Sequence, residues 1–165
     1  MLPFENASQN PQDEFFSFGV AEELIYALDR LPGLEVKART STWQFAGSNV
    51  SAQQVADSIG ATTVLAGRVR RTGDDVRVSV ELVRGSDGAI LWQDRFEGTV
   101  GDLFETRGRI AEGIAGTLQI RLEADEAAPV EVRTGSSEAY DHFLRGRYNL
   151  ALRNVPAIED GIRSF

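Results

Sequence analysis

The sequence contains no cysteine, one histidine (His142) and one lysine (Lys37). Without cysteine there can be no disulfide, no thiolate zinc site and no cysteine nucleophile. Lys37 stands in Glu-Val-Lys-Ala-Arg, so the Gly-Lys-Ser/Thr signature of a Walker phosphate loop is absent. A lone helical histidine is more often a surface or packing residue than a catalytic base. We therefore expect no catalytic residue, no bound cofactor and no metal site, and hence a chain that is not itself an enzyme.

Long apolar runs are also missing. No stretch reaches the roughly 18 apolar residues that a membrane helix needs, and no signal peptide precedes Pro3. The sequence therefore predicts no membrane segment. The lack of cysteine is compatible with two compartments. A cytoplasmic location is favoured, and the periplasmic portion of a membrane-anchored regulator is the alternative.

The composition is that of a folded protein. The 165 residues are 42% hydrophobic and 25% charged, which is enough for one buried core. The formal net charge of −8 repels a phosphate backbone at long range. We therefore expect no nucleic-acid binding by this chain.

Hydrophobic periodicity predicts the order β-α-β-α-β-β-β-α, followed by a linker and the start of a helical hairpin. This order indicates an α/β fold. Its mixed β-sheet has about five strands, including a three-strand antiparallel meander. About three helices flank the sheet, and a C-terminal helical hairpin fragment follows. The predicted strands are 1–6, 34–39, 62–71, 76–83 and 89–96, and the predicted helices are 17–31, 51–59 and 102–122.

Two helices carry local signals of their own. Ser51 and Gln54 form a capping-box pattern, and Gly60 would end that helix. In the earlier helix, Glu22 and Glu23 are adjacent carboxylates that point about 100° apart. They should not converge on one ligand without help, so a structural role is expected for them rather than a catalytic one.

Five arginines cluster between Gly67 and Arg84. A two-residue turn at Gly73-Asp74 would pair Val69 with Val78 and Arg70 with Arg77. The valines would then be buried, while Arg68, Arg70, Arg77, Ser79 and Glu81 would lie on the other face. Three acidic residues in this stretch reduce its charge to +2, and these strands lack aromatic platforms for bases. The face is interpreted as solvated or as contacting an acidic partner, with an anion site as the alternative.

A loop further upstream, STWQFAG, carries two aromatic residues, Trp43 and Phe45. Such residues either cover the edge of a core or anchor a partner. The candidate partner contacts are therefore Trp43, Phe45, Arg68, Arg70 and Arg77.

Three segments together resemble the TolB-amino-terminal-like domain: LPFEN, FFSFGVAEELIYALDRLPGLEVKARTS and VLAGRVRRTGDDVRVSVELVRGSDGAILWQDRF. The similarity runs from Leu2 to about Leu122. In bacteria this domain is coupled to tetratricopeptide repeats and follows an adenylate cyclase domain or a CadC-like winged helix. Phe18 departs from the aspartate of many relatives. If that aspartate caps the first helix, Ser17 or another residue must cap it here.

The tail EAYDHFLRGRYNLALRNVPAIEDGIRSF resembles a first tetratricopeptide repeat. Leu144, Gly146 and Tyr148 match the pattern of its first helix, and Phe165 would be the packing aromatic of the second. Because repeats need neighbours to bury their faces, we expect the natural chain to extend beyond Phe165. A strand that begins at Met1 is short, so we expect an extension upstream as well. The predicted organisation is an α/β domain (1–122), a linker (123–136) and a truncated repeat (137–165).

The resemblance implies a non-enzymatic regulatory or protein-interaction module of a larger bacterial signalling protein. Protein partners would bind through the repeats and the α/β domain, and self-association into a homo-oligomer is left open. The alternative function is a small-molecule or anion-binding sensor domain.

Overall fold

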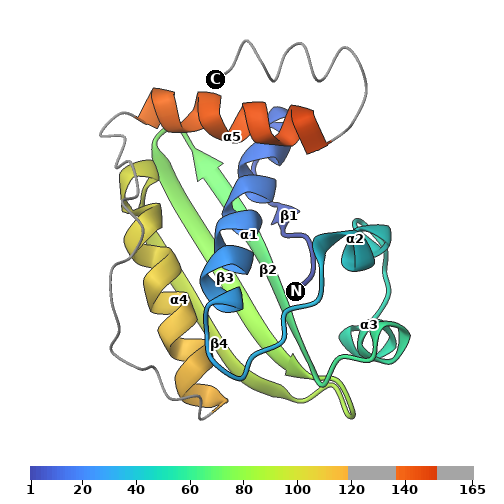
Figure 1. Ribbon diagram of the computed structural model, residues 1–165. Helices are drawn as coiled ribbons and strands as arrows, with labels where there is room; N and C mark the ends of the chain where they lie inside the picture. The colour runs from blue at the N-terminus through green and yellow to red at the C-terminus, as the bar shows by residue number, and fades with distance from the viewer. Residues whose placement is uncertain (119–136, 152–165) are drawn as a thin grey trace.

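The computed structural model describes residues 1–118 and 137–151 (Figure 1). Its centre is one four-stranded mixed sheet in the order β1-β2-β3-β4. β1 (Glu5–Asn6) runs parallel to β2 (Thr63–Thr72). β3 (Asp75–Arg84) and β4 (Ile90–Thr99) continue the sheet in antiparallel fashion. The predicted mixed α/β fold and its three-strand meander are confirmed.

The register of the first hairpin is the predicted one. Val69 lies opposite Val78, and Arg70 lies opposite Arg77. The turn between the strands contains Gly73 with φ 64°, a conformation that favours glycine. Because side chains alternate along a strand, the two valines enter the core together.

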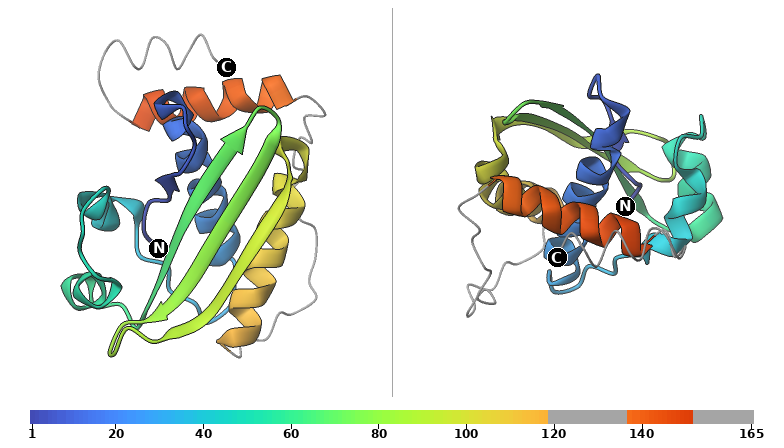
Figure 2. Two further views of the ribbon diagram at one scale, coloured as in Figure 1. Left: turned by 180° about the vertical axis from the view of Figure 1, so that it is seen from behind. Right: turned by 90° about the horizontal axis from the view of Figure 1, so that it is seen from above.

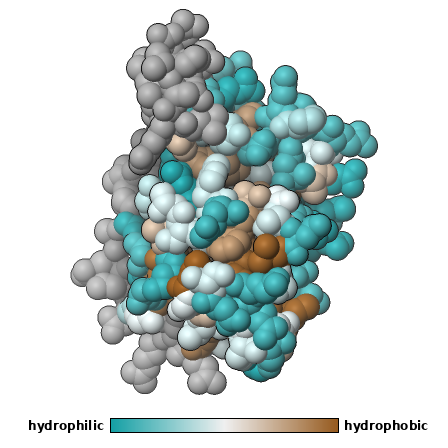
Figure 3. Space-filling model, turned by 90° about the vertical axis from the view of Figure 1, so that its right-hand side faces the viewer, coloured by the Kyte–Doolittle hydropathy of each residue, from teal (hydrophilic) through white to brown (hydrophobic). Residues whose placement is uncertain are grey.

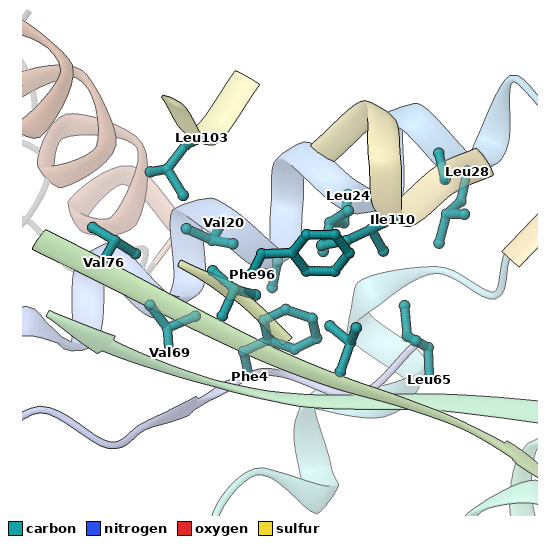
Figure 4. Close-up of a cluster of buried hydrophobic side chains, with 14 of the residues drawn as sticks. Phe4, Val20, Leu24, Leu28, Leu65, Val69, Val76, Phe96, Leu103 and Ile110 are labelled. Carbon is teal, nitrogen blue, oxygen red and sulfur yellow. The ribbon is translucent and has the colours of Figure 1, made fainter. Parts of the chain in front are cut away.

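Two long helices cover one face of the sheet: α1 (Glu14–Asp29) and α4 (Leu103–Thr117) (Figure 1). Their apolar residues meet those of the strands in one main core (Figure 4). None of the described helices lies in front of the opposite face of the sheet when the molecule is seen from behind (Figure 2). The main core includes Phe4, Val20, Leu24, Leu65, Val69, Val78, Phe96 and Ile110.

A smaller apolar cluster joins α3 (Ala52–Ile59) to the first part of β2 through Val55, Ala56 and Val64. α3 begins as predicted: Ser51 and Gln54 form a capping box. Gly60 ends the helix in the left-handed conformation.

The predicted strand at 34–39 is wrong. Residues 34–38 have no regular secondary structure and lead into the short helix α2 (Arg39–Thr42). The alternation there has a different cause, since Leu34 and Val36 pack against the main core from an unpaired segment. The sheet therefore has four strands rather than five.

α1 also begins earlier than predicted. A 3-10 turn, η1 (Pro11–Asp13), leads directly into Glu14, and the N-cap residue Asp13 makes no side-chain cap. Ser17 therefore lies inside the helix, where it is 1% exposed, and of the two alternatives for the cap Ser17 is excluded. Its hydroxyl oxygen has no hydrogen-bond partner.

α5 (Ser137–Ala151) crosses the N-terminal half of α1 on the side away from the sheet (Figures 1 and 2). The end of the predicted helix 102–122 beyond residue 118, the predicted linker 123–136 and the second helix of the predicted hairpin lie outside the described residues. In the portions that the structure does describe, no helix is long and apolar enough to cross a membrane.

Candidate interaction surfaces

Arginines line the uncovered face of the sheet, as strand alternation predicted. Arg68, Arg70 and Arg77 are all exposed, while Val69 and Val78 beneath them are buried. β4 adds a further exposed arginine, Arg95, which lies opposite Ser79 and so faces the same way. We call this surface the arginine face; it comprises Arg68, Arg70, Arg77, Ser79, Glu81, Gln93, Arg95 and Glu97.

Sequence reasoning missed Arg95 because it considered only the first two strands of the meander. The same alternation rule applied to β4 would have found it.

The arginines differ in their ion pairing. Arg77 Nε lies 2.7 Å from Glu97 Oε1, which offsets the repulsion between Arg77 and its cross-strand neighbour Arg70. Arg68 approaches Glu5 at 3.9 Å. Within the described residues, Arg70 and Arg95 have no acidic partner. Four guanidinium groups lie among three carboxylates here, those of Glu5, Glu81 and Glu97, so the surface is slightly positive on an acidic chain.

The turn after α2 holds Trp43 and Phe45 in the 3-10 segment η2 (Trp43–Phe45). Trp43 packs edge-on against Phe18 with ring centroids 5.5 Å apart, and the Arg39 guanidinium lies over both rings. Phe45 packs against the smaller cluster around Val55. Both aromatics thus cover a core edge, although Trp43 remains 38% exposed. Apolar side chains gather near the middle of the side that carries α2 and α3 (Figure 3).

Sequence reasoning missed the contact between α1 and α5. Leu144 of α5 is 0% exposed and belongs to the main core. It lies against Gly19 of α1 so closely that a Cβ atom on Gly19 would be 2.5 Å from Leu144 Cδ2. Tyr148, one helical turn further along α5, packs edge-on against Phe18 at 5.3 Å. Burial raises the pKa of the Tyr148 hydroxyl, and the nearby Glu14 carboxylate adds to the effect.

Charged side chains complete this contact. Arg147 donates from Nη2 to Glu22 at 2.5 Å and from Nη1 to Glu23 at 2.8 Å. Arg107 of α4 also pairs with Glu23, at 2.8 Å, and Arg39 pairs with Glu22. The expected structural role of the two glutamates fits these contacts. The two carboxylates reach one group here because the guanidinium of Arg147 offers two separate donors.

The other end of α5 is held against the β2–β3 hairpin. Arg71 of β2 donates to Asp141 at 2.7 Å. Next to this contact, Arg145 lies over the ring of Phe15 in α1, with its Cζ 4.7 Å from the centroid. An open groove of about 410 Å³ lies here, lined in part by Asn10, Arg71, Asp141 and Arg145.

A second cavity, of about 300 Å³, lies between residues 33–37, α3 and the start of β2. Neither cavity is lined by Arg68, Arg70 or Arg77. The described residues include no group of three or more His, Asp or Glu side chains that could hold a metal ion. His142 lies exposed on α5.

Residues 1–111 match the family described as HilA/YgeH-like transcriptional regulator, second domain. The chain belongs to this family. The match includes all four strands and most of α4, and it ends before α5.

One curated relative is the Rhizobium meliloti (strain 1021) protein named "Putative adenylate cyclase 3". It is 32% identical over 148 residues, which cover 89% of this chain and 25% of the relative. The chain thus spans about a quarter of the length of the relative it matches.

Two solved structures also match. Lipoprotein GNA1162 from Neisseria meningitidis has a TM-score of 0.49 and 16% identity, over 70% of this chain and 95% of that one. TolB from Acinetobacter baumannii has a TM-score of 0.46 and 14% identity, over 72% of this chain and 28% of that one.

Proposed function

We propose that this chain is a non-enzymatic regulatory and protein-interaction module of a larger bacterial signalling protein. The family supports a regulatory role, since its description is that of the second domain of a type of transcriptional regulator. The relative named as an adenylate cyclase supports a parent protein of the cyclase type, and the family description supports a transcriptional regulator as the alternative. The resemblance to the TolB-amino-terminal-like domain is compatible with both.

The arginine face is the observation that carries the interaction part of the proposal. It is a wide, uncovered sheet surface whose apolar residues point the other way, so the fold does not need it to be covered. Among the described residues, the guanidinium groups of Arg70 and Arg95 have no acidic partner, and an arginine fork binds carboxylates in two-point fashion. The partner surface it fits is acidic.

α5 supports a further part of the proposal, namely that tetratricopeptide repeats follow the α/β domain. Two of the residues that match the pattern of the first repeat helix face α1: Leu144 is buried against Gly19, and Tyr148 contacts Phe18. Gly146 is buried as well. In this proposal α5 is the first repeat helix, and the α/β domain covers one of its faces. Further repeats would supply additional partner contacts.

The test uses charge reversal on the arginine face of the full parent protein. Arg70→Glu and Arg95→Glu should each remove a defined set of co-purified proteins while leaving the melting temperature unchanged. Arg30→Glu, an exposed arginine just after α1, is the matched control with the same change in charge. If all three variants retain the same partners as the wild type, the arginine face is not the contact surface.

The same variants distinguish the sensor alternative. A thermal-shift screen with nucleotides and organic acids would show stabilisation by one ligand class if the arginines form an anion site. That stabilisation would disappear in Arg70→Glu and persist in Arg30→Glu. A small-molecule effect of this kind without loss of protein partners would replace the interaction proposal.

A further inference from the structure

α1 presents a surface shaped to receive one particular kind of helix. Its first two turns, from Phe15 to Ala21, are buried on every side, including the side away from the sheet. A helix that is apolar all round requires a cover on each face. The sheet covers one side of this segment, the Trp43 turn covers another, and α5 covers the outer one.

The outer cover is specified by residues at helical spacing on α5. Leu144 fills the gap above Gly19, Arg147 spans the two glutamates of α1, and Tyr148 packs against Phe18. Positions i, i+3 and i+4 lie on one face of a helix. The surface thus fits a helix that carries Leu-x-x-Arg-Tyr, a helix-in-groove mode of recognition.

Phe18 links this helix-docking surface to the Trp43 turn. Its ring packs edge-on against Tyr148 on one side and against Trp43 on the other, at 5.3 and 5.5 Å. Glu22 makes a second link, because its two oxygens pair separately with Arg147 of α5 and with Arg39 beside Trp43. Two independent contacts therefore run from α5 through α1 to Trp43.

We propose that the Phe18–Gly19–Glu22–Glu23 surface of α1 is a helix-docking site for a Leu-x-x-Arg-Tyr helix, and that its occupancy sets the position of the Trp43 turn. α5 is the helix that occupies it here. When α5 leaves, Phe18 loses its contact with Tyr148 and Glu22 loses its ion pair with Arg147, so Trp43 and Arg39 are held less firmly. The inference rests on the proposed function for its regulatory purpose, since it would let events in the following repeats change a partner-facing turn.

The full 165-residue chain allows a direct test, because it contains only two tryptophans. Trp92→Phe leaves Trp43 as the sole reporter. In that background, Leu144→Ala should raise the rate of amide exchange in α5 by more than about tenfold. The reason is that the loss of a buried leucine side chain lowers stability by more than the free energy that corresponds to a tenfold change in an equilibrium constant. Acrylamide quenching of Trp43 should rise in parallel, while β3 amides stay protected.

Arg147→Met is the second variant, in case Leu144→Ala disturbs the whole fold. It keeps the length of the side chain and removes both ion pairs. His142→Ala is the matched control, because His142 lies exposed on the same helix. It should change neither signal.

Reciprocity provides the opposite arm of the test. If docking and the Trp43 turn are coupled, a change at one end must affect the other by the same factor. Trp43→Ala should therefore raise α5 exchange. Faster α5 exchange with unchanged Trp43 quenching, or no effect of Trp43→Ala on α5, would overturn the coupling. Neither measurement needs a partner protein, so its outcome is independent of the experiments that test the proposed interaction function.

Discussion

Gly19→Ala offers a sharp test of how α5 is seated. In a helix interior, replacing glycine by alanine normally stabilises a protein by about 1 kcal/mol. At Gly19 the added methyl group would meet Leu144: the new Cβ would lie 2.5 Å from Cδ2, 2.8 Å from Cδ1 and 2.9 Å from Cγ. Contacts this short cannot persist, so either the Leu144 side chain must rotate or one of the two helices must move.

The structure indicates that the clash outweighs the gain in propensity. All three distances involve the branched end of one side chain, and Leu144 is 0% exposed, so rotation gives it little free space. Overpacking a core costs about 1–3 kcal/mol. Subtracting the helix-propensity gain of about 1 kcal/mol leaves an expected loss of up to about 2 kcal/mol.

α4 supplies matched controls. Gly108 and Gly116 are exposed helical glycines with nothing within 4 Å of a built Cβ atom. The same substitution there should raise the free energy of unfolding by up to about 1 kcal/mol at each site. Identical chemistry is therefore expected to have opposite signs on the two helices.

Urea unfolding followed by circular dichroism measures these differences, with the m-value checked for constancy. The pairing with Leu144 is tested by a double-mutant cycle, in which Gly19→Ala should cost less once Leu144→Ala has made room. If Gly19→Ala stabilises the chain as much as Gly108→Ala does, α5 does not lie on Gly19 and the docking geometry is wrong.

Two further predictions concern single polar groups. Ser17→Ala should raise the free energy of unfolding by about 1 kcal/mol, because it removes a buried hydroxyl that has no hydrogen-bond partner among the described residues. A melting temperature below that of the wild type would show that the hydroxyl makes a stabilising hydrogen bond. The Asp102 carboxylate accepts hydrogen bonds from the backbone N–H and the hydroxyl of Thr99, which hold the pKa of Asp102 below its usual range. A carboxyl whose folded pKa is depressed stabilises the fold above its unfolded pKa, and this stability is lost as the pH falls through the folded value. Stability should therefore fall more steeply below about pH 4 in the wild type than in Asp102→Asn, and equal slopes in the two proteins would contradict this role.

Local sequence patterns predicted those elements whose structure depends on local interactions. The β2–β3 register followed from one glycine turn and the alternation of valines, and α3 followed from its capping box. The same alternation misled at Leu34 and Val36. Alternating burial requires only that one side of an extended segment meet the core, whereas a strand also needs a neighbouring strand to pair with. Periodicity alone does not provide that second condition.

The α1–α5 contact lay beyond local patterns because its partners are about 125 residues apart, as in the pair Glu22 and Arg147. One signal for it was nevertheless present. Phe15, Phe16, Phe18 and Val20 leave the first turns of α1 without a polar side, so some element had to cover the outer face.

The sequence did not indicate which element packs over the outer face of α1. Many apolar helices could lie over Phe15 and Phe18. Selection of α5 comes from the space above Gly19 and from two carboxylates whose separate positions match the two ends of one guanidinium. Arginine provides such a fork and lysine does not. The specificity of the contact therefore resides in Gly19, Glu22 and Glu23, whereas the surrounding aromatics contribute buried area.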